Sequence, residues 1–261
     1  MEYEAVGSSM QMLNIKLASG EKIYVDGGKL ASKSDNVRLE AKLGGGTGFL
    51  KGVSMMFAGS TAFLLECSTD TDGMVSLAGS IPGKIKVVEL KDGESLLVEH
   101  MAFLATNDPS KIDVKGSWKG FFSGTGVFLE KFTGPCTIFL HVCGDIVEYN
   151  LADGSAVEID PGHIAAFGGD MRIDFSTVGG LKTELVGGEG LWMGKITGPG
   201  NVILHSVSRT KLRQSIAPNS GNNNSGGGGA LAGGLAGAAA GGLIGALGEA
   251  GKKGGFGGFK L

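Results

Sequence analysis

Hydrophobic and polar residues alternate along most of the first two hundred positions, a pattern typical of β-strands with one buried face. The alternation is clearest between residues 10 and 42, where one face would carry Leu13, Ile15 and Leu17. Short runs of this kind, separated by glycine-containing turns, continue to about residue 208. No long amphipathic helix is predicted in this part of the chain. The pattern therefore predicts an all-β body.

Two units of sequence recur along this body. The first is an apolar residue, a tight turn with glycine and an alternating strand, and its copies begin at Leu17, Leu90 and Leu151. The second is a strand, a turn and a strand, which is typical of a β-hairpin. It occupies 124–141 and 188–205 with the same internal spacing, and a more degenerate copy covers 59–77. We therefore expect a body built from three internal repeats.

Composition divides the chain of 261 residues into a body, 1–218, and a low-complexity tail, 219–261, which holds 17 of the 49 glycines. Within the tail, 219–229 has the composition of a flexible linker. The uncharged segment 230–248 then resembles a glycine zipper, because small residues recur every four positions. The residues that would contact a partner are Gly233, Gly237, Gly241, Gly245, Leu235 and Leu243. A disordered tail, a helix that packs on a partner and a membrane-inserting segment all remain open.

The charge balance argues against a general nucleic-acid surface. The formal net charge is −3, and the tail is basic, so the body is the acidic part. The three cysteines, Cys67, Cys136 and Cys143, form no CxxC motif and are expected to be core thiols in a reducing compartment. The N-terminus lacks an apolar signal core. We expect a cytoplasmic protein, with membrane association through the tail as an alternative.

Candidate chemistry is sparse. The glycine-rich stretch 44–52 departs from a phosphate-binding loop, because no Ser or Thr follows Lys51 in the required place. A cupin-type metal site would draw on the histidines His100, His141, His163 and His205, yet no HxH or HxxxH spacing is present. His163 with Asp160 could orient a general base, although a turn with a polar cap explains both. We therefore expect no catalytic residue, no metal ligand and no cofactor.

One group of residues suggests nucleic-acid binding as an alternative. An aromatic residue beside a lysine could stack on bases, and a basic group follows the last strand. These residues are Trp118, Lys119, Arg209, Lys211 and Arg213. A lysine also precedes the other two hairpins, which favours an architectural role as an edge charge. Nucleic acid is therefore not the expected partner.

The stretches 116–124, 179–190 and 160–167 carry a resemblance to a known family. Over residues 10–208 the chain resembles the mitochondrial biogenesis family named for altered inheritance of mitochondria protein twenty-four, whose prokaryotic members are uncharacterised. The resemblance implies an all-β body of double-stranded β-helix or barrel-like type, similar to the tryptophan RNA-binding attenuation protein fold. It also implies trimeric assembly, and it implies no catalytic residues.

These observations favour a non-enzymatic oligomeric scaffold. Its partner would be itself, as a homotrimer or a higher oligomer, and its tail would be a tether or a contact to a protein or membrane. The alternatives are a ring that binds single-stranded nucleic acid and, less favoured, a cupin-type metal enzyme.

Overall fold

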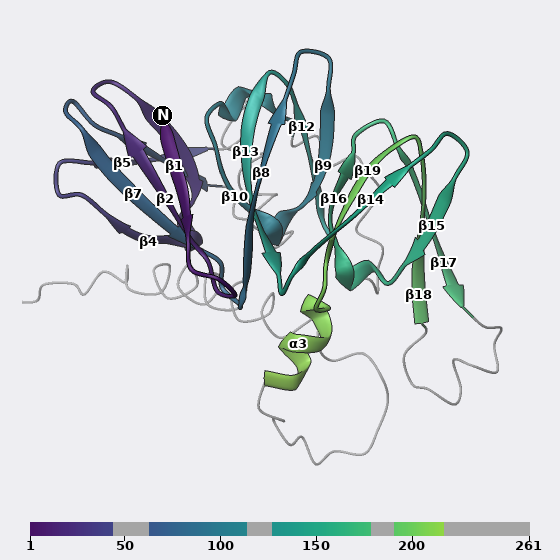
Figure 1. Ribbon diagram of the computed structural model, residues 1–261. Helices are drawn as coiled ribbons and strands as arrows, with labels where there is room; N and C mark the ends of the chain where they lie inside the picture. Colours follow the sequence, from purple (N-terminus) through teal and green to yellow (C-terminus); the bar gives the residue numbers. More distant parts are fainter. Residues whose placement is uncertain (44–62, 114–126, 179–190, 217–261) are drawn as a thin grey trace, which may run out of the picture. The chain divides into compact units, whose positions relative to one another are not determined.

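The computed structural model describes residues 1–43, 63–113, 127–178 and 191–216 (Figure 1). The chain divides into two compact units, Met1–Ala217 and Pro218–Leu261. The fold described below is that of the first unit. Antiparallel strands make up most of it, so the predicted all-β class is confirmed. The stretch 44–52 and the zipper segment 230–248 lie outside the described residues.

After β1 (Glu2–Val6), the strands follow in three segments, each with six strands. Segment 1 contains β2 (Met12–Leu17), β3 (Lys22–Asp26), the 3-10 helix η1 (Gly27–Lys29), β4 (Leu30–Lys33), β5 (Arg38–Leu43), β6 (Phe63–Ser68) and β7 (Gly73–Ala78). Segment 2 contains β8 (Gly83–Leu90), β9 (Ser95–Glu99), η2 (His100–Ala102), β10 (Phe103–Thr106), η3 (Pro109–Lys111), β11 (Ile112–Asp113), β12 (Leu129–Thr133) and β13 (Cys136–Cys143). Segment 3 contains β14 (Ile146–Leu151), β15 (Ala156–Ile159), η4 (Pro161–His163), β16 (Ile164–Gly168), β17 (Arg172–Val178), β18 (Leu191–Thr197) and β19 (Gly200–His205), and is followed by α3 (Arg209–Ile216).

The same pairings occur in each segment. The first strand pairs with the sixth, as in β2–β7, β8–β13 and β14–β19. The third strand also pairs with the sixth, with one register shift in each case, as in β4–β7, β10–β13 and β16–β19. The fifth strand pairs with the second and the fourth. Each segment therefore splits into two groups of three strands.

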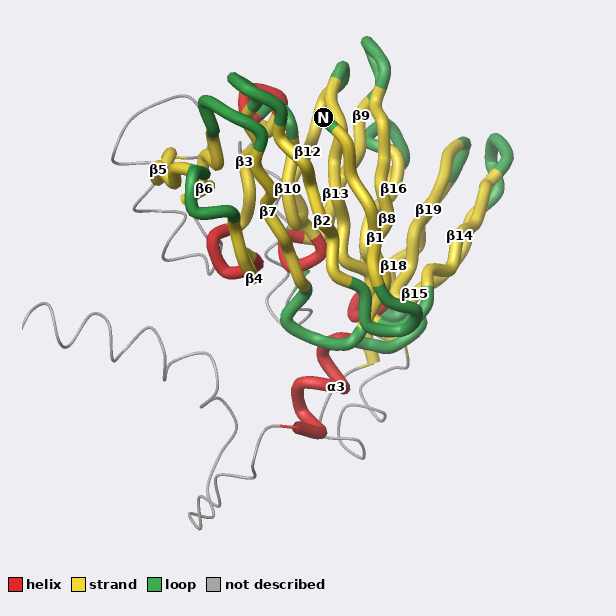
Figure 2. The backbone as a smooth tube through the Cα atoms, turned by 60° about the vertical axis from the view of Figure 1, so that its left-hand side comes forward, coloured by secondary structure: helices red, strands yellow, loops and turns green. Residues whose placement is uncertain are grey.

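The segments are joined because the second strand of one pairs with the third strand of the next, as β3–β10 and β9–β16. These pairings create two six-stranded sheets, β5-β6-β3-β10-β13-β8 and β11-β12-β9-β16-β19-β14 (Figure 2). The two other sheets are β1-β2-β7-β4 and β15-β18-β17. Among the described strands, each of these four sheets has an edge strand at each end. The double-stranded, barrel-like body implied by the resemblance stays a prediction.

A glycine turns the chain between the first and second strands of each segment. Gly20, Gly93 and Gly154 have φ angles of +81°, +81° and +71°. Because this region is strained for residues with a Cβ atom, glycine is the residue that such a turn favours. The recurring glycine in the sequence therefore has a local conformational cause.

Apolar side chains form three clusters, one centred on each segment. We call them core 1, which contains Leu13 and Ile15, core 2, which contains Phe132 and Ile138, and core 3, which contains Ile196 and Val202. The third strand of a segment also contributes to the core of the preceding one: β10 places Leu104 and Ala105 in core 1, and β16 places Ala165 and Ala166 in core 2. The cysteines Cys67, Cys136 and Cys143 are buried and free, as expected of core thiols, and burial raises the pKa of the Cys67 thiol to about 11.

Truncating Phe132 should destabilise the fold strongly. Phe132 is fully buried and stacks on Phe103 with ring centroids 5.3 Å apart. Phe132→Ala should lower the free energy of unfolding by about 3–5 kcal/mol, because it removes buried apolar surface and leaves a cavity. Met10→Ala is the control, since Met10 is 72% exposed and should change stability by less than about 0.5 kcal/mol. Urea unfolding followed by far-UV circular dichroism measures both, and equal costs for the two variants would contradict the core assignment.

Candidate functional site: a buried polar cluster and two free sheet edges

Ionisable side chains lie close together around the 3-10 helices and the start of α3. Their charges influence one another's pKa values, and nearly all of the side chains are buried. We call this set the buried polar cluster: Lys29, Glu99, His100, Glu130, His141, His205 and Arg209. The sequence pattern had singled out the histidines and Arg209 but not Lys29, Glu99 or Glu130. Lys29 lies in the 3-10 helix η1, and Glu99 and Glu130 lie in the strands β9 and β12. Local sequence does not predict that residues so far apart along the chain lie close together in the fold.

Arg209 fastens α3 to the second segment. A guanidinium nitrogen of Arg209 donates to the carboxylate of Glu99 at 2.6 Å. Burial raises the pKa of Glu99 and the charge of Arg209 opposes that change. A buried ion pair is costly to break, because removing one partner leaves the other charge uncompensated. This pair is therefore a structural connection.

His100 forms a second buried pair within segment 2. Its Nδ1 lies 2.9 Å from Oε1 of Glu130. Burial opposes a charge on this imidazole, but the hydrogen bond and the charges of Glu130 and Glu99 raise the pKa of His100 above its ordinary value. The pair therefore joins the 3-10 helix η2, which contains His100, to the strand β12, which contains Glu130.

His141 and His205 are held neutral. Burial, together with nearby cations that include Arg209, lowers the pKa of His141 to about 4 and that of His205 to about 3. The main-chain N–H of Cys143 donates to Nδ1 of His205 at 2.9 Å, which requires an unprotonated nitrogen. His205 is the last residue of β19, whereas His141 lies two residues before the end of β13. His205 therefore joins strands of two segments.

Asp160 and His163 are bound in structural contacts. The Asp160 carboxylate accepts a hydrogen bond from the main-chain N–H of Gly162 at 2.9 Å, and Nδ1 of His163 donates to the carbonyl of His205 at 2.8 Å. The polar-cap interpretation of Asp160 is therefore confirmed. Among the described residues, no three His, Cys, Asp or Glu side chains gather as a set of metal ligands would.

The residues proposed for nucleic-acid binding do not form one group in the part of the chain that is described. Trp118 and Lys119 lie outside the described residues. Arg209 pairs with Glu99, and Lys211 pairs with Asp160 at 2.8 Å. The basic group that follows the last strand, including Arg213, lies in the helix α3 (Arg209–Ile216), which the sequence pattern did not predict. The two paired cations already have acidic partners within the fold.

The tail residues of the proposed partner contact, Gly233, Gly237, Gly241, Gly245, Leu235 and Leu243, also lie outside the described residues. Within the described part of the chain, no helix has the length and apolar character needed to cross a membrane.

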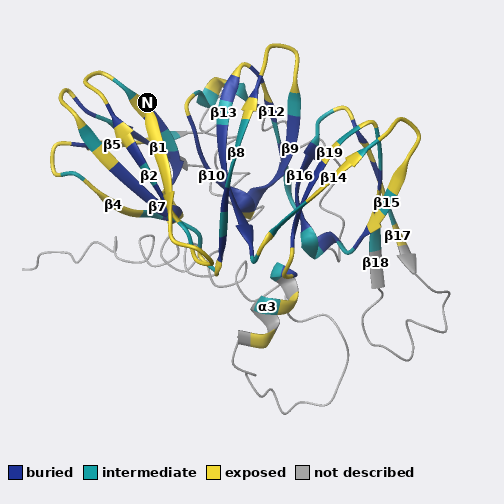
Figure 3. Cartoon of the chain, in the orientation of Figure 1, coloured by how far each residue is buried: buried dark blue, intermediate teal, exposed yellow. Residues whose placement is uncertain are grey.

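In the described part of the chain, two strands keep a free edge where their counterparts in other segments are paired. β4 ends the sheet β1-β2-β7-β4, and β15 ends the sheet β15-β18-β17. Every residue of β10 is buried and so are the first four of β16, whereas Ala31, Ser32 and Lys33 of β4 are exposed (Figure 3). The hydrophobic pattern of the sequence did not predict these edges. Aligning the three copies would have shown that Lys33 replaces Thr106 and Phe167 at one position.

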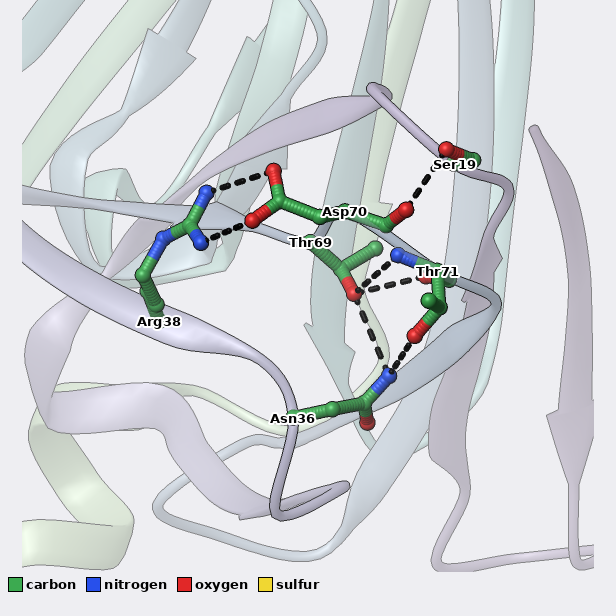
Figure 4. Close-up of polar contacts among 6 residues, drawn as sticks. All are labelled: Ser19, Asn36, Arg38, Thr69, Asp70 and Thr71. Carbon is green, nitrogen blue, oxygen red and sulfur yellow. Dashed lines mark hydrogen bonds and ion pairs between the residues drawn. The ribbon is translucent and has the colours of Figure 1, made fainter.

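Hydrogen bonds fix the chain that follows β4. The Asn36 side chain donates to the hydroxyls of Thr69 and Thr71 at 3.2 and 2.8 Å, and Arg38 pairs with Asp70 (Figure 4). Ser34 lies directly after β4, and its hydroxyl accepts a hydrogen bond from the main-chain N–H of Met74 at 2.9 Å. The free edge of β4 is therefore held in place by its own sheet.

The fold and these sites define an all-β protein whose segments share sheets and whose strands β4 and β15 each have one unpaired edge among the described residues. The chain belongs to the mitochondrial biogenesis AIM24 family, whose model matches residues 3–207. It is 29% identical over 213 residues to an uncharacterised protein of Streptococcus pyogenes serotype M6, covering 78% of this chain and 85% of that one. A crystal structure of a Streptococcus pyogenes protein is also similar, with a TM-score of 0.66, 24% identity, and coverage of 82% of this chain and 97% of the other. The latter similarity concerns the fold alone.

Acid should destabilise the protein partly through His205. In the unfolded chain this imidazole takes up a proton near pH 6.5, whereas in the fold it does so only near pH 3. The unfolded state therefore binds more protons between these values, and stability falls as the pH is lowered through them. His205 alone should account for a loss of up to about 2 kcal/mol between pH 7 and pH 5.

His205→Asn should flatten this pH dependence, because the amide oxygen still accepts from Cys143 but does not titrate in this range. Urea unfolding at pH 5, 6 and 7 measures the slope. Leu204→Val, at the neighbouring buried residue, should lower stability by about 1 kcal/mol at every pH. An unchanged slope in His205→Asn would contradict the assignment of a neutral, buried imidazole.

Proposed function

We propose that this protein is a non-enzymatic scaffold that assembles with further copies of itself, built from three copies of one β-unit. The observation that carries this proposal is the exposure of β4, whose counterparts β10 and β16 are buried by pairing with a preceding segment. An unpaired strand edge offers main-chain N–H and C=O groups to another chain. The same pairing pattern in all three segments supports an origin by repetition.

The buried polar cluster supports a structural role for the body. Its acids and bases are paired across strand ends, as in Arg209 with Glu99 and His100 with Glu130. Such pairs fix the arrangement of the segments and of α3. We propose that the tail is a flexible tether that carries a partner or membrane contact in a cytoplasmic assembly, since its composition is that of a linker followed by a glycine zipper.

Native mass spectrometry of the full chain tests the assembly. We expect a trimer or a higher multiple of the 26.6 kDa chain. Because edge pairing follows mass action, the spectra are recorded at protein concentrations from roughly 0.1 to 50 times the concentration at which half of the chains are assembled. A monomer at every concentration would overturn the scaffold proposal. Stoichiometric RNA or metal retained in the spectrum would instead favour one of the two alternatives, the nucleic-acid-binding ring or the metal enzyme.

Removing residues 219–261 tests the tether. Because the described strands and α3 all precede this region, the truncated chain should keep the wild-type urea midpoint and the wild-type number of subunits. A matched control replaces 230–248 by a Gly/Ser sequence of the same length. Loss of the assembled form on truncation, with the replaced tail retaining it, would contradict the tether role.

A further inference from the structure

The two internal junctions between segments have the same register. In β3–β10, Val25 lies opposite Ala105 and Tyr24 opposite Thr106. In β9–β16, Val98 lies opposite Ala166 and Leu97 opposite Phe167. The third strand has its register shift at the same place in each segment, which makes Ser32 of β4 the counterpart of Ala105 and Ala166. Both junctions therefore follow one docking rule: the second strand of a segment pairs with the third strand of the next segment, always in this register.

We infer that a second copy of this chain continues this rule, with β15 of one copy pairing antiparallel with β4 of the next. This inference rests on the proposed self-assembly and specifies its geometry. On β15, Ile159 and Glu158 take the places of Val98 and Leu97, since Ile159 lies opposite Gly194 as Val98 lies opposite Glu130. The register then puts Ile159 opposite Ser32, and Glu158 opposite Lys33, of the second copy.

Charge complementarity supports this register. Across the sheet β15-β18-β17, Asp174 lies opposite Lys195, and Lys195 lies opposite Glu158, so the signs alternate along one row. The row ends at the free edge with a negative charge. In the inferred register the next position is filled by Lys33, whose charge is positive. Directly opposed residues of opposite charge stabilise an antiparallel pair.

The internal junction differs at this position in an informative way. Segment 2 has the corresponding row Asp113, Lys131 and Leu97, and its next residue is Phe167 of segment 3. At this position the β9–β16 junction thus has an apolar pair and the β3–β10 junction has Tyr24 with Thr106, so neither has an ion pair, whereas β4 and β15 carry a base and an acid. Charged edges remain hydrated in the free chain. A charged pair at this junction therefore fits contact between separate chains.

The packing of small residues fits the same arrangement. Leu104 and Ala105 of β10 enter core 1, and Ala165 and Ala166 of β16 enter core 2. Their counterparts on β4, Ala31 and Ser32, are exposed in the single chain. In the inferred contact they would lie against core 3 of the neighbouring copy, beside Ile159. The contact therefore extends the pattern by which each third strand covers the preceding core.

The contact is head to tail, because it joins two different edges. A two-fold contact of β15 with β15 would bring Glu158 of one chain near Glu158 of the other. A two-fold contact of β4 with β4 would bring the two Lys33 side chains together. Like charges across an antiparallel pair are destabilising. A head-to-tail contact repeats from copy to copy, and it closes into a ring when the rotation between copies allows it.

Cysteine cross-linking of the full chain tests the register. Lys33→Cys and Glu158→Cys place thiols at exposed positions whose Cβ atoms would be about 4.5–5.5 Å apart in the assembly. Under mild oxidation, a mixture of the two single variants should give a cross-linked dimer that contains one chain of each kind, and the double variant should give a cross-linked series. The control is Lys33→Cys mixed with Ala156→Cys, since Ala156 is exposed on the same face two residues along β15. We expect at least a tenfold lower yield from the control.

Exchanging the charges of Lys33 and Glu158 is a second test of the register, and it does not depend on oxidation. Glu158→Lys and Lys33→Glu should each raise the concentration for half-assembly roughly tenfold, and the double variant should recover most of this loss. Recovery stops short of wild type because the lysine introduced at position 158 lies opposite Lys195 within its own sheet. Mass photometry measures the three variants, and their urea midpoints show that each is folded.

The outcomes separate this inference from the proposed function. Three results would overturn the β15–β4 register but leave the scaffold proposal intact, provided that a stable oligomer forms. They are the control cross-link, cross-linked dimers of Glu158→Cys alone, and a double charge exchange that does not restore assembly. A protein that is monomeric throughout would overturn both. The mixed 33–158 cross-link, together with recovery in the double charge exchange, is the expected result.

Discussion

The structure depends on the antiparallel pairing between the second strand of one segment and the third strand of the next. Through β3–β10 and β9–β16, each middle sheet belongs to two segments at once. Both faces of such a sheet are covered by apolar clusters, because one face belongs to each core. A segment by itself would lack three of the six strands of a shared sheet and would expose part of its apolar core to solvent. Stability of one segment therefore requires its neighbour.

The buried polar cluster complements this pairing at the strand ends. Hydrogen bonding at a sheet junction does not fix how the strand ends and the final helix are placed, whereas specific charge pairs do. Arg209 reaches Glu99 from α3, and His205 joins β19 to the main chain of Cys143 on β13. Since the desolvation of such groups is costly, their partners must be in place when the segments close. The cluster thus adds orientation to the cohesion that the cores provide.

The all-β class and the tight turns could be predicted from the sequence because both are local. Alternating residues such as Leu13, Ile15 and Leu17 fix one buried face, and Gly20 permits the turn that follows. The pairing of strands from different segments could not be predicted. β10 pairs with β3 and with β13, and these partner strands are far from it in sequence. The helix α3 was missed for a related reason. Its position depends on Arg209 meeting Glu99, a contact between residues that are distant along the chain.

The strands β4 and β15 show how this fold protects sheet edges that have no partner strand in the described chain. β4 and β15 are each four residues long, and they carry Lys33 and Glu158 where the two internal junctions have uncharged residues. Short, charged edges limit indiscriminate pairing between sheets. Lys33 and Glu158 have opposite charges, so in the inferred contact the two different edges are complementary, whereas two copies of the same edge would bring like charges together. If chains join through these edges, the residues that keep a single chain hydrated would also select the orientation of the next chain.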